Sequence, residues 1–211
     1  MTIPLGLEHD WYPGSVPSNV SLGRNVYIDT TYAFAAFHSG MEPALTLGES
    51  AGAYIRSSFI VGPRGRVRVG AYTIINGSYI VCERKVDIGA HCLFAWGTFI
   101  TDSWPASSQS AESRTAAVVA ASRHPARPFP ETGGRPVTIE DNVWVGFDSV
   151  ILPGVTLGRG CIVGSRTIVD VDVPPYAVVV GNPQRVVRVL HPTDDEAARQ
   201  NAMKHLRADR P

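Results

Sequence analysis

Four side chains of this 211-residue chain stand out as groups that could accept a proton in catalysis. Histidine is the usual choice, because its pKa lies near the working pH. His124 occurs in the segment SRHPARP, His91 follows IGA, and His38 occurs in AAFHSG. Asp102 ends the segment GTFITD, where it could act as a base if desolvation raised its pKa, or could cap a turn. We assign no role to the histidines outside the predicted core: His9, His191 and His205.

Each histidine also has a plainer alternative that the sequence leaves open. His124 lies between arginines in a long loop, and such a histidine can simply be solvated. His91 is three residues after Ile88 and is expected to point outward, where the alternative is an exposed histidine without a role. His38 lies among aromatic residues that could form a binding pocket or could pack against the core.

The three cysteines, Cys82, Cys92 and Cys161, do not suggest a disulfide framework or a metal site. Their number is odd, and no Cys-x-x-Cys spacing occurs. A reducing, cytoplasmic compartment is therefore expected. Cys92 and Cys161 occupy small positions that should face inward, so we expect buried, inert thiols there.

The bulk composition excludes several classes of partner. Lysine plus arginine and aspartate plus glutamate number 19 each, which gives no reason to expect nucleic acid or an anionic membrane surface. No window approaches the ~18–20 apolar residues of a membrane span. The first residues, MTIPLGLEHDWYPG, lack a basic region followed by an apolar run, so no signal peptide is expected.

The elements that must position the candidate groups are indicated by a six-residue repeat. Aliphatic residues recur at this interval in TIEDNVWVGFDSVILPGVTLGRGCIVGSRTIVD, at Ile139, Val145, Ile151, Leu157, Val163 and Val169. The same interval links Val16, Leu22 and Ile28, then Val69, Ile75 and Val81, then Ile88, Phe94 and Ile100. A small or β-branched residue often follows four positions later, as at Thr73, Cys92, Thr98, Val143, Ser149, Val155, Cys161 and Thr167. Three such extended segments close an 18-residue coil, and stacked coils make a three-sided, all-β solenoid.

Interruptions of the repeat locate the loops. The repeat breaks at 33–46, is irregular over 47–68 and is absent over 103–136, which we predict to be a long excursion loop with a helical centre from Glu112 to Ser122. The solenoid domain is expected to span 1–190 and to end near Pro174–Pro175. Thr193 and Glu196 resemble a capping box, which predicts a short C-terminal helix over about 194–208 in a tail of residues 191–211.

The segment PVTIEDNVWVGFDSVILPGVTLGRGCIVGSRTIVDVDVPPYAVVVGNPQRVVR resembles the terminal coils of the hexapeptide-repeat acyltransferases, and in particular the xenobiotic, maltose and galactoside acetyltransferases. The resemblance is close over 136–190 and rests on the hexads alone over 16–102. It implies a left-handed parallel β-helix, a homotrimer with sites between neighbouring prisms, and transfer of an acetyl or other acyl group from acyl-CoA. The acceptor would be a hydroxyl or amine of a small molecule.

In the resembled family the general base is a histidine just after a strand like GTFITD. Here that place holds Asp102, Ser103, Trp104 and Pro105, so the base must be displaced or unusual. His124 and Asp102 are the catalytic candidates. His38, His91 and Trp104 are candidates for acceptor binding, although Trp104 could instead pack the loop onto the prism.

The resemblance also suggests where the coenzyme would lie. Positions that match the family's groove include Gly146, Ser165 and Thr167. The family's lysine is replaced by Val171, and Asp170 stands where threonine is common. Arg166, Arg185 or Arg188 could supply the missing cation for the coenzyme's phosphates, or could be solvated surface charges.

Two other functions remain open. A catalytically silent or repurposed member would bind a small molecule or a partner through the same groove, because function belongs to the site and not to the fold. A carbonic anhydrase on the same prism would need three converging histidines, and the repeats lack histidines spaced in that way.

Overall fold

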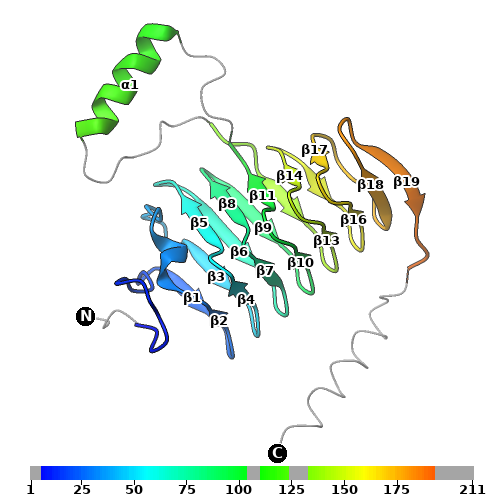
Figure 1. The fold of residues 1–211 in the computed structure, drawn as a ribbon, viewed down its shortest axis with the longest axis horizontal. Coiled ribbons are helices and arrows are strands. Elements are labelled where there is room, and N and C mark those ends of the chain that lie inside the picture. Colours follow the sequence, from blue (N-terminus) through cyan, green and yellow to red (C-terminus); the bar gives the residue numbers. More distant parts are fainter. Residues whose placement is uncertain (1–5, 104–109, 124–132, 193–211) are drawn as a thin grey trace, which may run out of the picture.

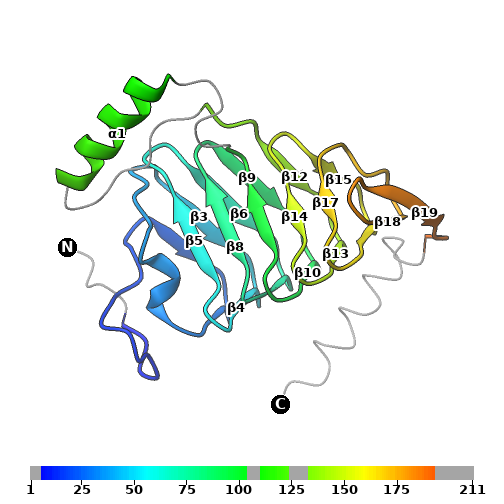
Figure 2. The same cartoon turned by 45° about the horizontal axis from the view of Figure 1, so that its top comes forward.

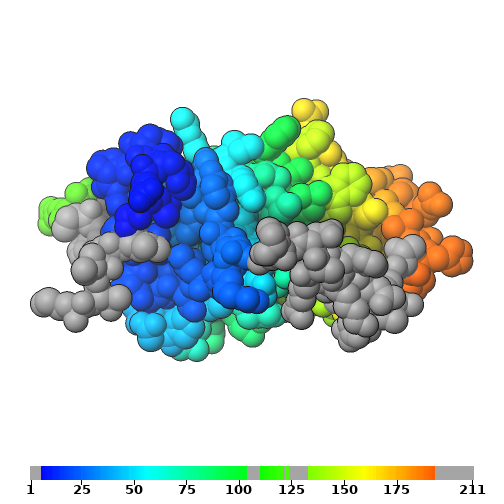
Figure 3. Space-filling view, turned by 90° about the horizontal axis from the view of Figure 1, so that it is seen from below, coloured from blue at the N-terminus to red at the C-terminus, as the bar shows by residue number. Residues whose placement is uncertain are grey.

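The computed structural model describes residues 6–103, 110–123 and 133–192, and most of these residues form an elongated column of stacked coils (Figure 1). The strands of each coil are short, and each lies beside the matching strand of the next coil (Figure 2). The N-terminal coils stand at one end of the column and the last strands at the other, as the space-filling view also shows (Figure 3).

The described strands belong to three sheets, and every pair but the last is parallel. The six-stranded sheet contains β1 (Val20–Leu22), β3 (Leu45–Leu47), β6 (Arg66–Val69), β9 (Lys85–Ile88), β12 (Val137–Ile139) and β15 (Thr156–Leu157). The eight-stranded sheet contains β2 (Tyr27–Ile28), β4 (Gly52–Tyr54), β7 (Ile74–Asn76), β10 (Leu93–Phe94), β13 (Trp144–Val145), β16 (Ile162–Val163), β18 (Ala177–Val180) and β19 (Arg185–Val189). The five-stranded sheet contains β5 (Ser58–Val61), β8 (Tyr79–Cys82), β11 (Phe99–Thr101), β14 (Val150–Ile151) and β17 (Ile168–Val169).

The predicted 18-residue coil is confirmed in the second half of the column. Ile139 lies opposite Leu157, and the same 18-residue offset relates the partners in the other two sheets. The anchors are buried in one continuous core that runs the length of the coils. The small residues predicted for the inner corners are also buried: Thr73, Cys92, Thr98, Val143, Ser149, Val155, Cys161 and Thr167.

The repeat is less regular in the first half, and here two predictions were wrong. Ile80 and Cys82 face the core on β8, whereas the predicted anchor Val81 faces outward. The corner after Ile75 is one residue shorter than six-residue spacing requires, and a shift of one position moves a strand residue to the opposite face. The segment 47–68, which looks irregular in sequence, forms a complete coil with β4 and β5.

None of the described residues in the predicted loop, 103–136, belongs to a strand. The loop contains α1 (Ala111–Arg123), which agrees with the helical centre predicted at 112–122. The two ends of this segment meet, because the Arg135 N–H donates to the Asp102 carbonyl over 2.6 Å. The predicted C-terminal helix at about 194–208 lies outside the described residues.

The two ends of the column differ from the parallel coils between them. At the C-terminal end β19 turns back antiparallel to β18, and the Gln184 amide contacts the backbone of Asp170 and Val171 at 3.2 Å each. At the N-terminal end a strap of residues 6–14 lies against the turn that includes the 3-10 helix η1 (Thr31–Phe34).

Asp10 fixes the strap. Its carboxylate accepts hydrogen bonds from the Thr30 hydroxyl at 2.6 Å, the Thr31 N–H at 2.7 Å and the Tyr12 N–H at 3.0 Å, and also from the Thr31 hydroxyl. Desolvation alone would raise the pKa of Asp10, but these hydrogen bonds outweigh it and lower the pKa well below its ordinary value.

Candidate active site

The turns that follow the five-stranded sheet stack into one edge of the column, which we call the loop-base corner. It is formed by residues 37–40, 61–65, 82–85, 102–103 with 134–135, 152–154 and 170–172, in that order along the column. The segment that carries α1 leaves from this corner (Figure 1). Adjacent turns are linked by backbone hydrogen bonds, including Gly62 N–H to Cys82 O at 2.8 Å.

Asp102 is fully buried at this corner, and backbone amides surround its carboxylate. One oxygen accepts the Glu83 N–H at 2.7 Å, and the other accepts the N–H groups of Arg84 and Lys85 at 2.7 Å each. The turn between β8 and β9 has too few residues to satisfy these amides by itself, so the carboxylate of the next coil does so. These contacts match the second of the two roles considered for Asp102, the cap of a turn.

The resembled family has its histidine just after the strand that ends here at Thr101. In this chain, the described residues at that position, Asp102 and Ser103, form a tight, buried turn. The Thr101 hydroxyl donates to the Ser103 carbonyl at 2.6 Å, and the Ser103 N–H donates back to that hydroxyl at 3.1 Å. Both side chains are buried. The next residue of the predicted site, Trp104, and the candidate base His124 lie outside the described residues.

His38 lies at the same corner as Asp102, three coils away. Its N–H donates to the Val61 carbonyl at 2.8 Å, and its side chain is half-buried. Three strand spacings correspond to about 14 Å along the column. The structure therefore brings His38 and Asp102 to one edge of the molecule, although the sequence separates them by 64 residues.

His91 lies at a different corner, between the six-stranded and eight-stranded sheets. Its ring stacks on that of Tyr72 with the centroids 5.2 Å apart, and its φ of 58° is in the left-handed region. A whole sheet separates this corner from the loop base in the single chain. His91 could meet the loop-base corner only in an assembly that brings two chains together.

The residues predicted to bind the coenzyme fall into two groups. Gly146 and Thr167 are buried and serve the stacking of the coils: the Gly146 N–H donates to Val163 O at 2.7 Å, and the Thr167 hydroxyl accepts the Gly181 N–H at 3.1 Å. Ser165 and Arg166 are exposed at the corner between the eight-stranded and five-stranded sheets. Arg166 makes only a loose contact with Asp148, at 3.8 Å.

Arg185 and Arg188 lie on the exposed terminal strand β19. Their Cα partners on β18 are Val180 and Val178. With Ser165 and Arg166 they make up the part of the predicted coenzyme site whose side chains solvent can reach.

The three thiols are unsuited to nucleophilic chemistry, because burial raises their pKa values. Burial raises the pKa of Cys92 to about 11 and that of Cys161 to about 12. Burial, followed by the charge of Asp102, raises the pKa of Cys82 even further. All three thiols are therefore protonated near neutral pH, as the inert role predicted for Cys92 and Cys161 requires.

The outer faces of the three sheets differ sharply in polarity. The six-stranded sheet turns polar and charged residues outward: Ser21, Thr46, Arg68, Asp87, Thr138 and Thr156. The eight-stranded sheet turns an apolar row outward: Tyr27, Ile74, Leu93, Trp144, Ile162 and Val178. The five-stranded sheet does the same with Ile60, Tyr79, Val81, Phe99, Val150, Leu152 and Ile168.

Two negative findings apply to the described part of the chain. Within residues 6–103, 110–123 and 133–192, no three His, Cys, Asp or Glu side chains gather closely enough to hold a metal ion. In the same ranges, no helix is long and apolar enough to cross a membrane.

Residues 136–170 match the family described as bacterial transferase hexapeptide (six repeats). A chloramphenicol acetyltransferase of Agrobacterium fabrum is 46% identical over 50 residues, which cover 24% of this chain and 24% of that protein. The alignments with the first curated relatives span only about a quarter of those proteins' length, between 24% and 28%.

Solved structures extend the likeness to most of the chain. A hexapeptide-repeat-containing acetyltransferase of Vibrio cholerae, solved in complex with acetyl coenzyme A, is 27% identical with a TM-score of 0.56 and covers 76% of either chain. A variant of an N-acyltransferase of Bacillus cereus, solved with dTDP and coenzyme A, has a TM-score of 0.62 over 89% of this chain and 91% of its own. At 16% identity, the second likeness is one of fold alone.

Proposed function

We propose that this hexapeptide-repeat protein is an acyltransferase that moves an acetyl or other acyl group from acyl-CoA to a hydroxyl or amine of a small-molecule acceptor. The observation that carries the proposal is the column of hexapeptide coils, which resembles an acetyltransferase solved with acetyl coenzyme A over most of the chain. A cytoplasmic location, expected from the unpaired thiols, would suit acyl-CoA as the donor.

The two apolar outer faces support a homotrimer; the left-handed winding of its prisms is proposed from the family resemblance alone. A closed ring of three identical chains buries two different faces of each chain, because its interfaces are heterologous. The eight-stranded and five-stranded sheets offer two such faces, and the polar six-stranded sheet would face solvent. The corner between the apolar faces carries Ile55, Trp96 and Phe147, each more than half exposed in the single chain. We place this corner toward the threefold axis.

In such a ring, the loop-base corner lies where one prism meets its neighbour. The five-stranded sheet ends at this corner, and its apolar face is one of the two that would be covered. A groove between chains could bring His91 of one chain toward the loop base of another. This arrangement keeps both His38 and His91 as candidates for acceptor binding.

The reaction needs one proton transfer and no covalent intermediate on the protein. A base removes the proton of the acceptor hydroxyl or amine as that atom attacks the thioester carbonyl. The carbon–sulfur bond then breaks, and the departing thiolate takes up a proton. We propose His124 as the base, because Asp102 has both carboxylate oxygens engaged by backbone amides. Trp104 remains a proposed acceptor contact.

The coenzyme's phosphates would bind the exposed arginines near the C-terminal end of the column. Arg166, Arg185 and Arg188 are exposed, and guanidinium groups suit phosphate oxygens through paired hydrogen bonds. Ser165, exposed beside Arg166, could add one more donor. Gly146 and Thr167 would shape the groove without donating to the coenzyme.

The direct test is binding of the coenzyme to the full chain. Coenzyme A at about 100 times its Kd should stabilise the native state by about 2.7 kcal/mol. For a domain of this size, that corresponds to a rise of about 5–10 °C in Tm. Differential scanning fluorimetry with coenzyme A measures the shift, and adenosine serves as the control. No shift at millimolar coenzyme A would rule out the proposed donor.

A second candidate function is ligand binding without catalysis. The buried turn at Thr101–Ser103 favours it, because this turn has no histidine where the resembled family has its base. A silent member that only binds a ligand would show the thermal shift but no chemistry. Thiol release from acetyl-CoA, followed with a panel of sugar, amine and antibiotic acceptors, separates the two. Release with at least one acceptor supports the acyltransferase.

A further inference from the structure

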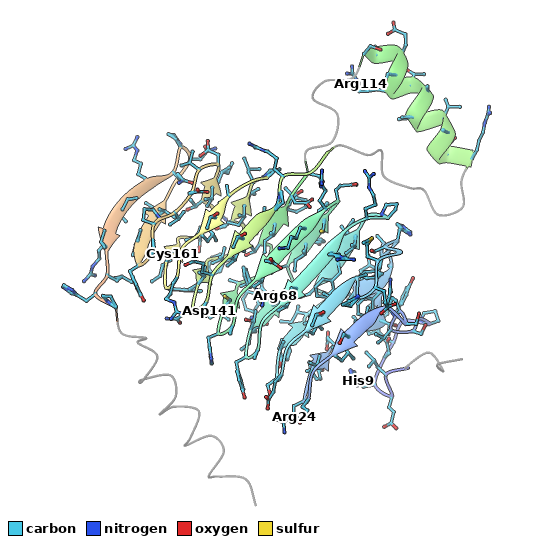
Figure 4. The ribbon with its side chains drawn as sticks, turned by 180° about the vertical axis from the view of Figure 1, so that it is seen from behind. His9, Arg24, Arg68, Arg114, Asp141 and Cys161 are labelled. Carbon is cyan, nitrogen blue, oxygen red and sulfur yellow. The ribbon has the colours of Figure 1, made fainter. Side chains whose placement is uncertain are left out.

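The corner between the six-stranded and eight-stranded sheets carries His91, and we call this edge the His91 corner. It is formed by residues 24–25, 49–50, 71–72, 90–91, 141–142 and 159–160. Backbone hydrogen bonds link these turns from coil to coil, and the His91 N–H donates to Ala71 O at 2.9 Å. Arg24 and Asp141, which belong to this corner, lie on the side of the column away from α1 (Figure 4). The backbone of His91 is therefore fixed by the stacking of the coils.

The His91 ring is held by an aromatic neighbour and not by hydrogen bonds. Its centroid lies 5.2 Å from that of Tyr72, and the two planes are 11° apart. Among the described residues, neither ring nitrogen of His91 has a hydrogen-bond or ion-pair partner, although the side chain is half-buried. The Nε2 of His9, by contrast, lies 3.0 Å from the Ile28 carbonyl. Stacking on Tyr72 thus orients the His91 imidazole and leaves its nitrogens available to a ligand.

His91 belongs to the same coil as Asp102. The chain passes from His91 through β10 and β11 to Asp102 within one turn of the column, so the two residues differ in height by less than one strand spacing, about 5 Å. His38, which lies at the loop-base corner itself, stands three coils from Asp102. Height along the column therefore favours His91 over His38 as a group that acts beside Asp102.

The proposed ring would bring the His91 corner of one chain to the loop-base corner of the next. The loop-base corner is the outer edge of the five-stranded face, and the His91 corner is the outer edge of the eight-stranded face. Both apolar rows run along the column, so a threefold axis parallel to the column would cover them and place equal coils of the three chains at equal heights. His91 would then face the neighbour's Asp102–Ser103 turn.

The proposed reaction requires a proton donor at this place. A thiolate holds a proton more tightly than an imidazole does, so the sulfur that departs from the thioester takes up a proton readily. The described residues of the turn offer none: the Asp102 carboxylate accepts three backbone N–H groups, and Ser103 is buried. Histidine can carry a proton near neutral pH, which suits it to this step.

We propose that His91 of one chain donates the proton to the coenzyme thiolate that departs in its neighbour's site. The carbon–sulfur bond breaks, the imidazolium N–H proton passes to the sulfur, and the products are the acylated acceptor, the free thiol and a neutral imidazole. The imidazole regains a proton from solvent before the next turnover. This inference rests on the proposed function and on the proposed ring, and it adds a second chain to the chemistry of the site.

The test compares two acyl donors that differ in their need for a proton. Acetyl-CoA releases a basic thiolate, whereas S-(4-nitrophenyl) thioacetate releases a thiolate that the nitro group stabilises. The test variant is His91→Asn, because asparagine adopts the left-handed backbone that His91 has, with φ of 58°. The matched control is His9→Asn, which replaces a histidine of the N-terminal strap (Figure 4). Both donors are assayed with the acceptor that releases the most thiol, and melting curves verify the fold of each variant.

His91→Asn should lower kcat with acetyl-CoA by ~100-fold or more, as the loss of a general acid does, and kcat with the nitrophenyl donor by less than ~3-fold. His9→Asn should change neither value. Equal losses with the two donors would overturn the proton-donor role, because a contact to the acceptor or a structural role would affect both alike. An active natural chain whose His91→Asn variant is equally active would remove this role alone. A natural chain that releases thiol from neither donor would remove the proposed function as well.

Cross-linking tests whether the histidine comes from a second chain. His91→Cys with Arg135→Cys places one thiol at each of the two corners, and the three natural thiols are buried. A short bis-maleimide should join different chains of this variant, so that linked dimers and trimers appear on a denaturing gel. His91→Cys with Thr138→Cys is the control and should stay monomeric, because Thr138 lies on the polar six-stranded sheet. A monomeric band for the first pair, with its fold retained, would overturn the placement of His91 in the neighbour's site.

Discussion

At the scale of single residues, the contacts of Asp102 favour the cap of a turn over a general base. Asp102 accepts three backbone N–H groups of a turn that precedes it by 17 to 19 residues. The local sequence GTFITD does not predict these partners, because they come into contact with Asp102 only when the coils stack. The sequence could therefore locate Asp102 at the root of the loop but could not choose between a base and a cap.

Substitution of Asp102 and of His124 should separate stability from catalysis. Asp102→Asn replaces a charged acceptor of buried hydrogen bonds, each worth about 1.5–3 kcal/mol, so we expect Tm to fall by several degrees. The turnover of the folded enzyme should fall less than ~10-fold. His124→Ala should lower kcat by ~100-fold or more and leave Tm unchanged. Melting curves and thiol-release kinetics on both variants measure this, and the opposite pattern would return Asp102 to the role of base.

Asp10 makes the N-terminal strap sensitive to acid. Its pKa is lower in the folded chain than in the unfolded chain, so its contribution to stability is complete above about pH 4 and is lost as the pH falls toward the folded value. Trp11, which stacks on Tyr32 and lies 5.2 Å from the Arg56 guanidinium, reports on the strap. We expect Trp fluorescence to change below pH 4 in the natural chain. In Asp10→Asn the strap should already be loosened at pH 7, and a flat acid profile in the natural chain would contradict the assignment.

At the scale of elements, the six-residue repeat carries most of the fold. Where the spacing is regular, as from Ile139 to Val169, sequence alone predicts the coil length, the inward residues and the small corner residues. The corner after Ile75 is one residue shorter. There the predicted inward residue is wrong by one position, because the six-residue spacing selects Val81 and the buried residue is Ile80. Corner length depends on local backbone turns, and six-residue spacing does not encode it.

Gly146 tests how tightly neighbouring coils approach each other. A Cβ built there would lie 2.6 Å from the Ser165 backbone nitrogen, and a backbone atom cannot yield as a flexible side chain would. Gly146→Ala should destabilise the chain by about 1–3 kcal/mol. Gly40→Ala is the control, because its Cβ would meet only Pro63 O at 4.0 Å, and it should change stability by less than about 0.5 kcal/mol. Chemical denaturation of both variants checks the difference.

At the scale of the whole molecule, the single chain leaves two of its three faces apolar. The outward positions can be predicted from the sequence only after the inward ones are fixed, so these two apolar faces became visible only in the structure. The distribution of polarity supports an assembly in which each chain touches two others through different surfaces.

The proposed trimer is tested by introducing charged residues on one outer face and then on another. Leu93→Asp with Ile162→Asp places two carboxylates on the outward row of the eight-stranded sheet, and burying them unpaired would be costly. We expect the natural chain to sediment as three copies of 22.7 kDa and the double variant as one. Thr138→Asp, on the polar six-stranded sheet, should leave the assembly intact. A natural chain that sediments as a monomer would contradict the proposed ring.

The hydrogen bond between Arg135 and Asp102 brings together two residues that are 33 positions apart in the sequence. None of the described residues between them belongs to a strand, so we expect that another segment could replace this stretch while the described strand pairs stay intact. If the proposed acceptor site lies in this segment, grafting a segment of another sequence at the same junction would be a route to a new acceptor.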